Sequence, residues 1–325
     1  MEKPFLDVFK QIEVLESRGL IIESKASAVQ QLLQTSYYDL INGYKMLFLS
    51  DNKSSENGER FIEGTKIDDL INLYQLDREL RHIIMKTSLD IECNFYTTLA
   101  YCIALKYGEK ESDYLKFSNY KNTKGKERKK FFDIVEGKLA FSQHPALVHY
   151  REKYGNIPPW ILVKDLSFGN FIAWYKLCDQ DIKERVISLM TGLTPTEEVK
   201  ERFIKSLEIF NTFRNRAAHG GLIYNFKTRA ELPFIKDRHT IFDIGKGKYR
   251  QDIGRSDIAS FNIALYFLYS EKKSLLIENL VYLNGALNKY QVNTPDYYEK
   301  VLTIMGFPHD YNKRIHEFIG ISYDG

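Results

Sequence analysis

The chain has 325 residues, of which 46 are Lys or Arg and 43 are Asp or Glu, so its formal net charge is only +3. With 44% apolar and 27% charged residues, the composition is that of an ordinary globular protein, and the longest apolar run, residues 263–269, is far shorter than the ~18 residues that cross a bilayer. A membrane span is thereby excluded. The first residues lack the layout of a secretory signal, so we expect a cytoplasmic protein.

Cysteine and histidine spacing indicates neither disulfides nor a metal site. Cys93, Cys102 and Cys178 are odd in number and form no C-x-x-C pair, so we expect three reduced thiols. The seven histidines show no spacing typical of zinc ligands. We therefore predict no metal ion and no other cofactor.

Helical periodicity predominates from the start of the chain. The N-terminal subregion, residues 1–64, is predicted to hold two short helices, the first stopping at Gly19 and the second capped by Ser24. Thr65 and Asp68 resemble a capping box, and the apolar residues that follow repeat at helical spacing. This pattern predicts one helix, or two stacked pieces, of about 40 residues.

Helices are also predicted at residues 168–178 and 182–190. Thr194 and Pro195 then provide an N-cap and a first-turn proline for a further helix, in which one face is apolar. This helix is expected to end at Gly220, because glycine readily takes the left-handed conformation that closes a helix.

Residues 222–255 are rich in glycine and charge, and we expect an irregular connector or a small hairpin near residues 239–244. Helices resume at residues 257–269 and 271–289, and a last one is predicted from Pro295 to about Gly306. The sequence predicts an all-α fold in a single domain covering residues 1–325, with a core at about 65–221 and C-terminal helices at about 256–306.

An arginine, an amide and a histidine lie close together at the end of the helix that stops at Gly220. Asn215 and His219 are four residues apart and share a helix face, which the long side chain of Arg214 can reach. Histidine exchanges protons near neutral pH and arginine is a permanent phosphate ligand, so the set suits RNA cleavage. From the residues alone, a C-terminal helix cap beside a solvated charge is the commoner explanation of such a pattern.

The string R-N-x-x-x-H from Arg214 to His219 resembles the signature of HEPN ribonucleases. Further segments, in the same order and spacing, resemble the Abi-like abortive-infection family of bacterial phage-defence proteins, the Abi-D/Abi-F group. These segments are residues 15–20 (LESRGL), 37–44 (YYDLINGY), 76–81 (LDRELR) with Ile91-Glu92, 144–169 from His144-Pro145 to Phe168-Gly169, and 305–308 (MGFP). The resemblance implies a HEPN-like helical bundle with additional helices and a ribonuclease-like site.

Carried over residue by residue, the resemblance implies that His219 is the acid or base, Arg214 the phosphate ligand and Asn215 a polar orienting group. Asn225 falls where the family usually has another polar residue, although a loop asparagine that satisfies backbone groups is the alternative.

Glu92 and Arg78 match charged positions of the family on the long helix and are possible supporting residues. A buried structural ion pair is the alternative interpretation, because buried charges need partners. One position departs from the family pattern, since Tyr96 stands where a basic residue is expected.

Residues 121–130 form the most basic stretch of the chain. They are predicted to be an exposed loop leading into a helix, either as solvated surface or as an RNA-backbone contact. Because the total charge is nearly neutral, any contact surface for nucleic acid must be local. The candidate RNA-binding residues are Lys121, Lys124, Lys126, Arg128, Lys129, Lys130 and Arg216.

The sequence contains one R-N-x-x-x-H string, whereas HEPN chemistry usually combines two. We therefore expect a homodimer with a composite site on its two-fold axis. The implied function is a metal-independent endoribonuclease toxin that cleaves single-stranded RNA to 2′,3′-cyclic phosphate and 5′-OH ends, restrained by a small non-coding RNA. A non-catalytic RNA-binding protein of the same defence system and an all-α interaction scaffold remain as alternatives.

Overall fold

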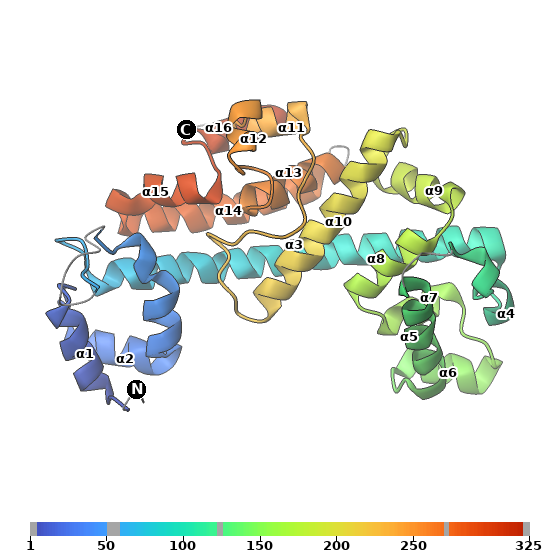
Figure 1. Cartoon of the computed structure of the whole chain (residues 1–325), viewed down its shortest axis with the longest axis horizontal. Helices are drawn as coiled ribbons and strands as arrows, with labels where there is room; N and C mark the ends of the chain where they lie inside the picture. Colours follow the sequence, from blue (N-terminus) through green and yellow to red (C-terminus); the bar gives the residue numbers. More distant parts are fainter. Residues whose placement is uncertain (1–4, 51–58, 122–125, 270–272, 321–325) are drawn as a thin grey trace.

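The computed structural model describes residues 5–50, 59–121, 126–269 and 273–320 (Figure 1). Within these ranges the chain is built from helices, and the only β pairing consists of two isolated bridges, between Ile21 and Lys66 and between Leu49 and Phe61. The predicted all-α fold is confirmed.

In chain order the α-helices are α1 (Val8–Ser17), α2 (Lys25–Thr35), α3 (Ile67–Tyr107), α4 (Glu111–Tyr114), α5 (Glu127–Phe141), α6 (Pro145–Tyr154), α7 (Pro159–Leu162), α8 (Phe168–Leu177), α9 (Gln180–Thr191), α10 (Glu197–Ala218), α11 (Lys236–Ile241), α12 (Lys246–Arg250), α13 (Ile258–Leu268), α14 (Lys273–Asn293), α15 (Pro295–Met305) and α16 (Tyr311–Ile319).

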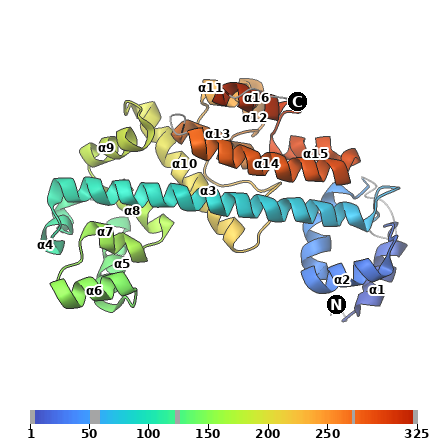
Figure 2. The ribbon, with the colours of Figure 1, turned by 180° about the vertical axis from the view of Figure 1, so that it is seen from behind.

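Helix α3 is the long axis around which the other helices are arranged (Figure 1). The N-terminal helices α1 and α2 lie at one end of it, and α4 to α7 lie at the other. Figure 2, the view from behind, shows α14 alongside α3 and α10 crossing its far side. Helix α3 therefore connects the two ends of the molecule without a break.

The predicted length of α3 is confirmed, since it has 41 residues and ends at Gly108 with φ +85°. Its predicted cap is wrong by one residue. The backbone N–H of Lys66 donates to Asp69 Oδ2 at 2.8 Å, whereas the hydroxyl of Thr65 lies 3.0 Å from that of Tyr297. The Thr65 hydroxyl thus contacts Tyr297 of α15 and does not cap α3, as its sequence position suggests it would.

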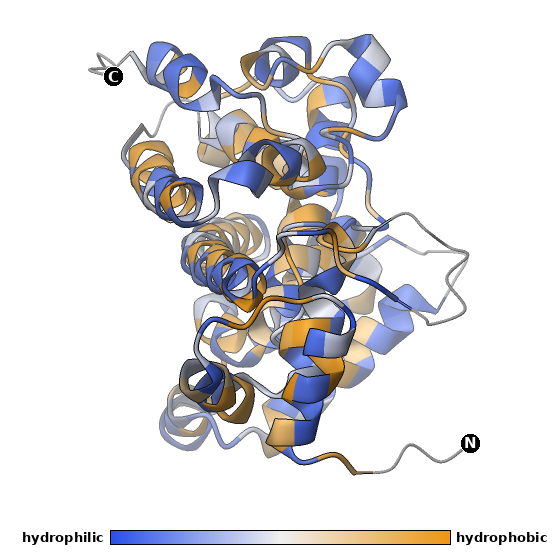
Figure 3. Ribbon diagram, turned by 90° about the vertical axis from the view of Figure 1, so that its left-hand side faces the viewer, coloured by the Kyte–Doolittle hydropathy of each residue, from blue (hydrophilic) through white to orange (hydrophobic). Residues whose placement is uncertain are grey.

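Helix α10 owes its position to the predicted apolar face. Phe203, Leu207, Phe210 and Phe213 are fully buried, and the last two pack against the ring of Phe261 on α13. Figure 3 shows hydrophobic residues in orange and hydrophilic residues in blue within the same helices.

The two ends of α10 differ in how well their caps were predicted. Its N-cap is Thr196, whose side chain accepts from the N–H of Val199 at 3.3 Å, so the predicted cap at Thr194 is wrong. At the other end, Gly220 takes φ +70°, which confirms the predicted left-handed stop.

The second half of the chain holds more helix than the sequence indicates. Residues 239–244 form no hairpin, because His239 is buried within α11 and bonds to the carbonyl of Gly254 at 3.0 Å. Helix α14 extends to Asn293, and α15 is not the last helix because α16 follows it. No helix within the described ranges is long and apolar enough to span a bilayer, and the three cysteines are unpaired, as predicted.

Candidate active site at the carboxyl end of α10

The R-N-x-x-x-H string occupies the last turn of α10 and the residue after it. This end of α10 lies below α3 in Figure 1, between the N-terminal helices and α5 to α7. His219 follows the last helical residue, Ala218, and its backbone N–H donates to Asn215 O at 3.2 Å. The imidazole is exposed to solvent and is not turned into the apolar interior. A second subunit or a nucleotide can therefore reach it.

Arg214 connects α10 to α3 through Glu92. Its Nη2 lies 3.7 Å from Glu92 Oε2, and the glutamate side chain is nearly buried. Burial raises the pKa of Glu92, and the nearby guanidinium partly opposes this shift. Both Glu92 Oε2 and Arg214 Nε lack a hydrogen-bond partner among the described residues. The ion pair thus orients Arg214, and because its Nε is buried, an anionic ligand would contact the terminal nitrogens of the guanidinium.

Two asparagines continue this arrangement along α10. Arg214 Nη1 donates to Asn215 Oδ1 at 3.2 Å, and Asn215 Nδ2 donates to Asn211 Oδ1 at 3.4 Å. Asn215 therefore contacts the guanidinium, as expected for a polar group that orients it. The structure brings Arg214, Asn215 and Glu92 together, with His219 one turn further along the chain.

Arg216 folds back over the loop that follows α10. Its Nε donates to Leu222 O at 3.3 Å, and its guanidinium lies 5.1 Å from the centre of the Phe226 ring. A Cβ atom at Gly221 would collide with this guanidinium, so the glycine leaves room for it. Arg216 shapes the loop and remains exposed at its edge.

The two other predicted supporting residues lie apart from this group. Asn225 is exposed in a turn, and within the described ranges no hydrogen bond joins it to Arg214 or His219. Arg78 is half-exposed and its nearest carboxylate, that of Glu79, is 3.8 Å away. The alternative of a buried pair is therefore wrong for Arg78, whereas Glu92 does pair, with Arg214.

Tyr96, which departs from the family pattern, lies one helical turn beyond Glu92 on α3. Its hydroxyl accepts from Lys164 Nζ at 3.3 Å, and its ring centre is 5.4 Å from that of Phe171. A basic group is thus supplied near this position by Lys164 from another part of the chain.

The basic segment divides into two kinds of residue. Lys121, Lys126 and Lys130 are exposed, and Lys129 is exposed but pairs with Asp133 at 2.8 Å. Arg128 instead donates to the carbonyls of Phe117 at 3.2 Å and Tyr120 at 3.0 Å. Its guanidinium therefore joins α5 to the preceding loop. Lys124 lies outside the described residues.

Asp77, which the sequence analysis quoted only within the segment 76–81 and gave no role, contacts the loop after His219. It is fully buried, and Oδ1 accepts from the backbone N–H groups of Ile223 at 2.8 Å and Tyr224 at 2.7 Å. The available signal was a carboxylate within the apolar stripe of α3, between the buried Leu76 and Leu80.

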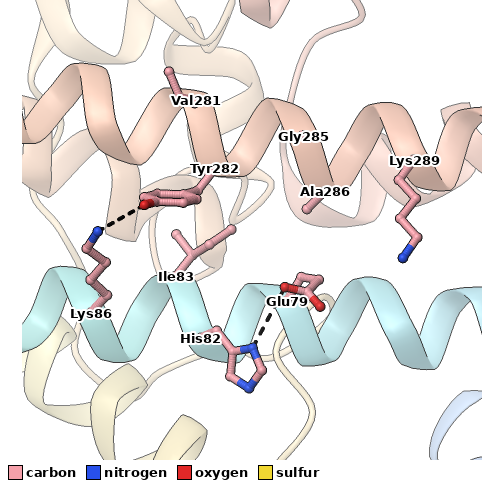
Figure 4. Close-up of a pocket in the computed structure, with 9 residues that line it drawn as sticks. All are labelled: Glu79, His82, Ile83, Lys86, Val281, Tyr282, Gly285, Ala286 and Lys289. Atoms are coloured by element: carbon pink, nitrogen blue, oxygen red, sulfur yellow. Dashed lines mark hydrogen bonds and ion pairs between the residues drawn. The ribbon is translucent and has the colours of Figure 1, made fainter.

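A groove of about 450 Å³ lies between α3 and α14 (Figure 4). Glu79, His82 and Lys86 line it from α3, and Tyr282 and Lys289 line it from α14. At about 100° per residue, Glu79 and Lys86 lie on the side of α3 opposite to Asp77. The groove is thus separate from the carboxyl end of α10. Among the residues described, no three His, Cys, Asp or Glu side chains are grouped to hold a metal ion.

Comparison with known proteins supports the kinship. A family model described as Abi-like protein matches residues 30–225, a range that includes Asp77, Glu92 and the whole R-N-x-x-x-H string. Comparisons with curated proteins and with solved structures give no match. Because the family model covers more than half of the chain, this protein belongs to the Abi-like family, which is named for abortive infection of phage-infected bacteria.

Proposed function

We propose that this protein is a HEPN-type, metal-independent endoribonuclease toxin of a phage-defence system, active as a homodimer and restrained by a small non-coding RNA. One observation carries the proposal. The exposed His219 ends the helix in which Arg214 is held by Glu92 and Asn215. A proton-transfer group and an oriented cation at one accessible helix end are what metal-free RNA cleavage needs.

In the proposed reaction, one imidazole accepts the proton of a ribose 2′-OH, whose oxygen attacks the adjacent 3′ phosphate. The P–O5′ bond breaks, and the second imidazole of the dimer donates a proton to the departing 5′ oxygen. Arg214 stabilises the negative charge that grows on the phosphate oxygens. Proton transfer of this kind contributes ~10²–10⁴-fold to the rate. The products are a 2′,3′-cyclic phosphate and a 5′-OH.

The dimer follows from the single copy of the string in the chain. A two-fold axis passing near the exposed ends of two α10 helices would bring two Arg214 and two His219 residues to one cleft. The accessibility of His219 supports this arrangement.

Single-stranded RNA is the proposed substrate, because its unstacked bases can rest on exposed aromatic rings while cations follow the backbone. Tyr154 and Trp160, at the end of the molecule that carries α5, are 56% and 45% exposed. Lys126 and Lys130 offer exposed ammonium groups on α5 or just before it. These residues support an RNA path from α5 towards α10.

The test is cleavage of an oligonucleotide with one ribonucleotide among deoxyribonucleotides, in the presence of EDTA. We expect cutting only after the ribonucleotide, with cyclic phosphate and 5′-OH ends, and loss of cutting in His219→Ala. The matched control is His82→Ala, whose side chain is 68% exposed in the separate groove. Products with 3′-OH and 5′-phosphate ends would contradict the proposal. RNA binding without cleavage by the wild type would favour the non-catalytic RNA-binding alternative.

The restraining RNA has its own test. We expect the purified protein to carry a discrete small RNA, detected as excess absorbance at 260 nm and as one band after phenol extraction. Removal of this RNA should increase cleavage of the oligonucleotide. If the purified protein carries no RNA and cleaves equally well before and after nuclease treatment, the proposed restraint by a small RNA is wrong.

A further inference from the structure

We infer that Asp77 is a positioning residue that fixes the loop after His219 and couples it to the segment before α3 that carries Tyr44. The inference rests on the proposed function, because it assigns Asp77 a role through the imidazole of His219. Its structural part, the anchoring of the loop, can be tested without any enzymatic activity.

The carboxylate of Asp77 is completely surrounded by donors. Oδ1 accepts from the N–H groups of Ile223 and Tyr224, and Oδ2 accepts from Tyr44 OH at 2.9 Å and Arg81 Nη1 at 2.6 Å. All four partners donate hydrogen bonds to the carboxylate, and the Tyr44 hydroxyl in turn accepts from Arg81 Nη1 at 3.4 Å. This environment suits an ionised carboxylate, which can only accept.

Asp77 brings together three segments that are distant in the sequence. Tyr44 belongs to the region before α3, Asp77 and Arg81 lie on α3, and Ile223 and Tyr224 follow α10. Burial raises the pKa of Asp77, while the hydrogen bonds and Arg81 oppose that shift. A buried carboxylate is tolerated only when hydrogen-bond donors surround it. The loop after α10, helix α3 and the segment with Tyr44 each supply a donor, so displacement of one segment weakens the attachment of the others.

The N-terminal region also touches the loop directly. The rings of Tyr44 and Tyr224 stack with centres 6.0 Å apart, and a Cβ atom at Gly43 would lie 3.6 Å from Leu222 Cδ2. Three consecutive loop residues, 222 to 224, are therefore clamped between α3 and the segment that carries Tyr44.

The clamp matters for His219 because two glycines separate the histidine from it. Gly221 N–H donates to Arg216 O at 2.9 Å and Arg216 Nε donates to Leu222 O at 3.3 Å, so the end of α10 holds the near side of the loop. Asp77 holds its far side, at Ile223 and Tyr224. Loss of this anchor would let the loop, and His219 just before it, move relative to Arg214, whose own anchor is Glu92.

The experiment compares Asp77→Ala, Asp77→Asn and Tyr44→Phe in the full-length protein. Alanine removes both acceptors, asparagine keeps one oxygen, and phenylalanine removes one donor and keeps the ring. We expect amide hydrogen exchange at Ile223 and Tyr224 to increase by at least about tenfold in Asp77→Ala and by less in the other two. The matched control is Asp90→Ala, an exposed carboxylate on the same helix, which should leave this exchange unchanged.

Cleavage of a single-stranded RNA oligonucleotide is the second measurement. We expect kcat to fall by at least about tenfold in Asp77→Ala, with partial recovery in Asp77→Asn and KM changed less than about twofold. A variant that is only less stable would contain fewer folded molecules, but kcat per folded molecule would not follow the order of the three substitutions. If Asp77→Ala does not fold, Asp77→Asn and Tyr44→Phe provide the same comparison.

Unchanged hydrogen exchange at the Ile223 and Tyr224 amides in Asp77→Ala would contradict the inference that Asp77 anchors the loop. Increased exchange with an unchanged kcat would overturn the positioning role. If the wild type cleaves no RNA, the proposed nuclease fails, and the exchange data alone still decide whether Asp77 holds the loop.

Discussion

Arg214 and Glu92 face each other where α10 crosses α3, with 3.7 Å between Nη2 and Oε2. At this separation the two groups attract each other as charges but share no hydrogen bond. The pair with Glu92 therefore orients the guanidinium without taking up an N–H group, while Nη1 donates to Asn215 Oδ1. Such an arginine suits transient binding of a phosphate that carries extra negative charge in the transition state.

The first prediction concerns Glu92→Gln. We expect kcat for RNA cleavage to fall by about tenfold because Arg214 loses its orienting charge. The free energy of unfolding should change by no more than about 1 kcal/mol, since burial already raises the pKa of this carboxyl and the amide avoids the cost of a buried charge. Cleavage kinetics and urea unfolding measure the two effects.

A double-mutant cycle with Arg214→Gln provides the control for this prediction. If the two residues act as a pair, the double variant should lose less activity than the sum of the single losses. Additive losses would show that Glu92 acts independently of Arg214.

The composite site predicts a dominant effect of inactive subunits. When wild type is mixed one to one with an Arg214→Ala/His219→Ala double variant and the subunits exchange freely, about one quarter of the dimers contain two wild-type chains. Activity should therefore fall to about that fraction of the activity of the same total wild-type protein. A fall to one half would indicate that each subunit cleaves alone.

The basic segment should separate into binding and structural residues. Lys126→Ala and Lys130→Ala are expected to weaken RNA binding and to reduce its salt dependence, each by about one released counterion. Arg128→Ala should instead lower the free energy of unfolding by about 1–3 kcal/mol, because the carbonyls of Phe117 and Tyr120 lose their donor. Salt titrations of binding and urea unfolding distinguish the two classes, and the reverse assignment would contradict the structure.

His239 predicts how stability depends on pH. Burial lowers the pKa of this imidazole to about 4, below the ~6.5 of an unfolded histidine. The stability that neutral His239 contributes is therefore fully present above pH ~6.5 and is lost as the pH falls towards 4, by about 3 kcal/mol in total. Urea unfolding at pH 7.5 and 4.5 should show this loss in the wild type.

His239→Gln is the comparison variant, because a neutral amide can also donate to Gly254 O and accept from Ile235 N–H. Asp257, whose pKa burial raises to about 6, has the opposite effect, since its contribution falls as the pH rises to 6. It is present in both proteins, so the difference between them isolates His239. Equal acid losses in the two proteins would contradict the prediction.

The elements that depend on local sequence were predictable. The cap at Ser24, the length of α3 and the apolar face of α10 follow from side chains within a few positions of each other. The errors arise where distant residues intervene. The hydroxyl of Thr65 contacts Tyr297 and so does not cap α3. The buried contact of His239 with Gly254 favours a helix where the alternation of residues suggested a hairpin.

The candidate site shows the same division. The string from Arg214 to His219 and its place at a helix end were predicted from the sequence, and Glu92 was named, from the resemblance, as a possible supporting residue. The contact between Glu92 and Arg214 depends on where α10 crosses α3, which no local pattern specifies. Asp77 was overlooked because its partners lie in segments far before and far after it, although an acid inside an apolar stripe was a visible sign.

Both anchors of the proposed site, Asp77 for the loop and Glu92 for the guanidinium, belong to the unbroken helix α3. An inserted or deleted residue between them would rotate one anchor by about 100° relative to the other and shift it by about 1.5 Å along the axis. The interval from Asp77 to Glu92 on α3 therefore sets how the anchor of the loop after His219 lies relative to the anchor of Arg214.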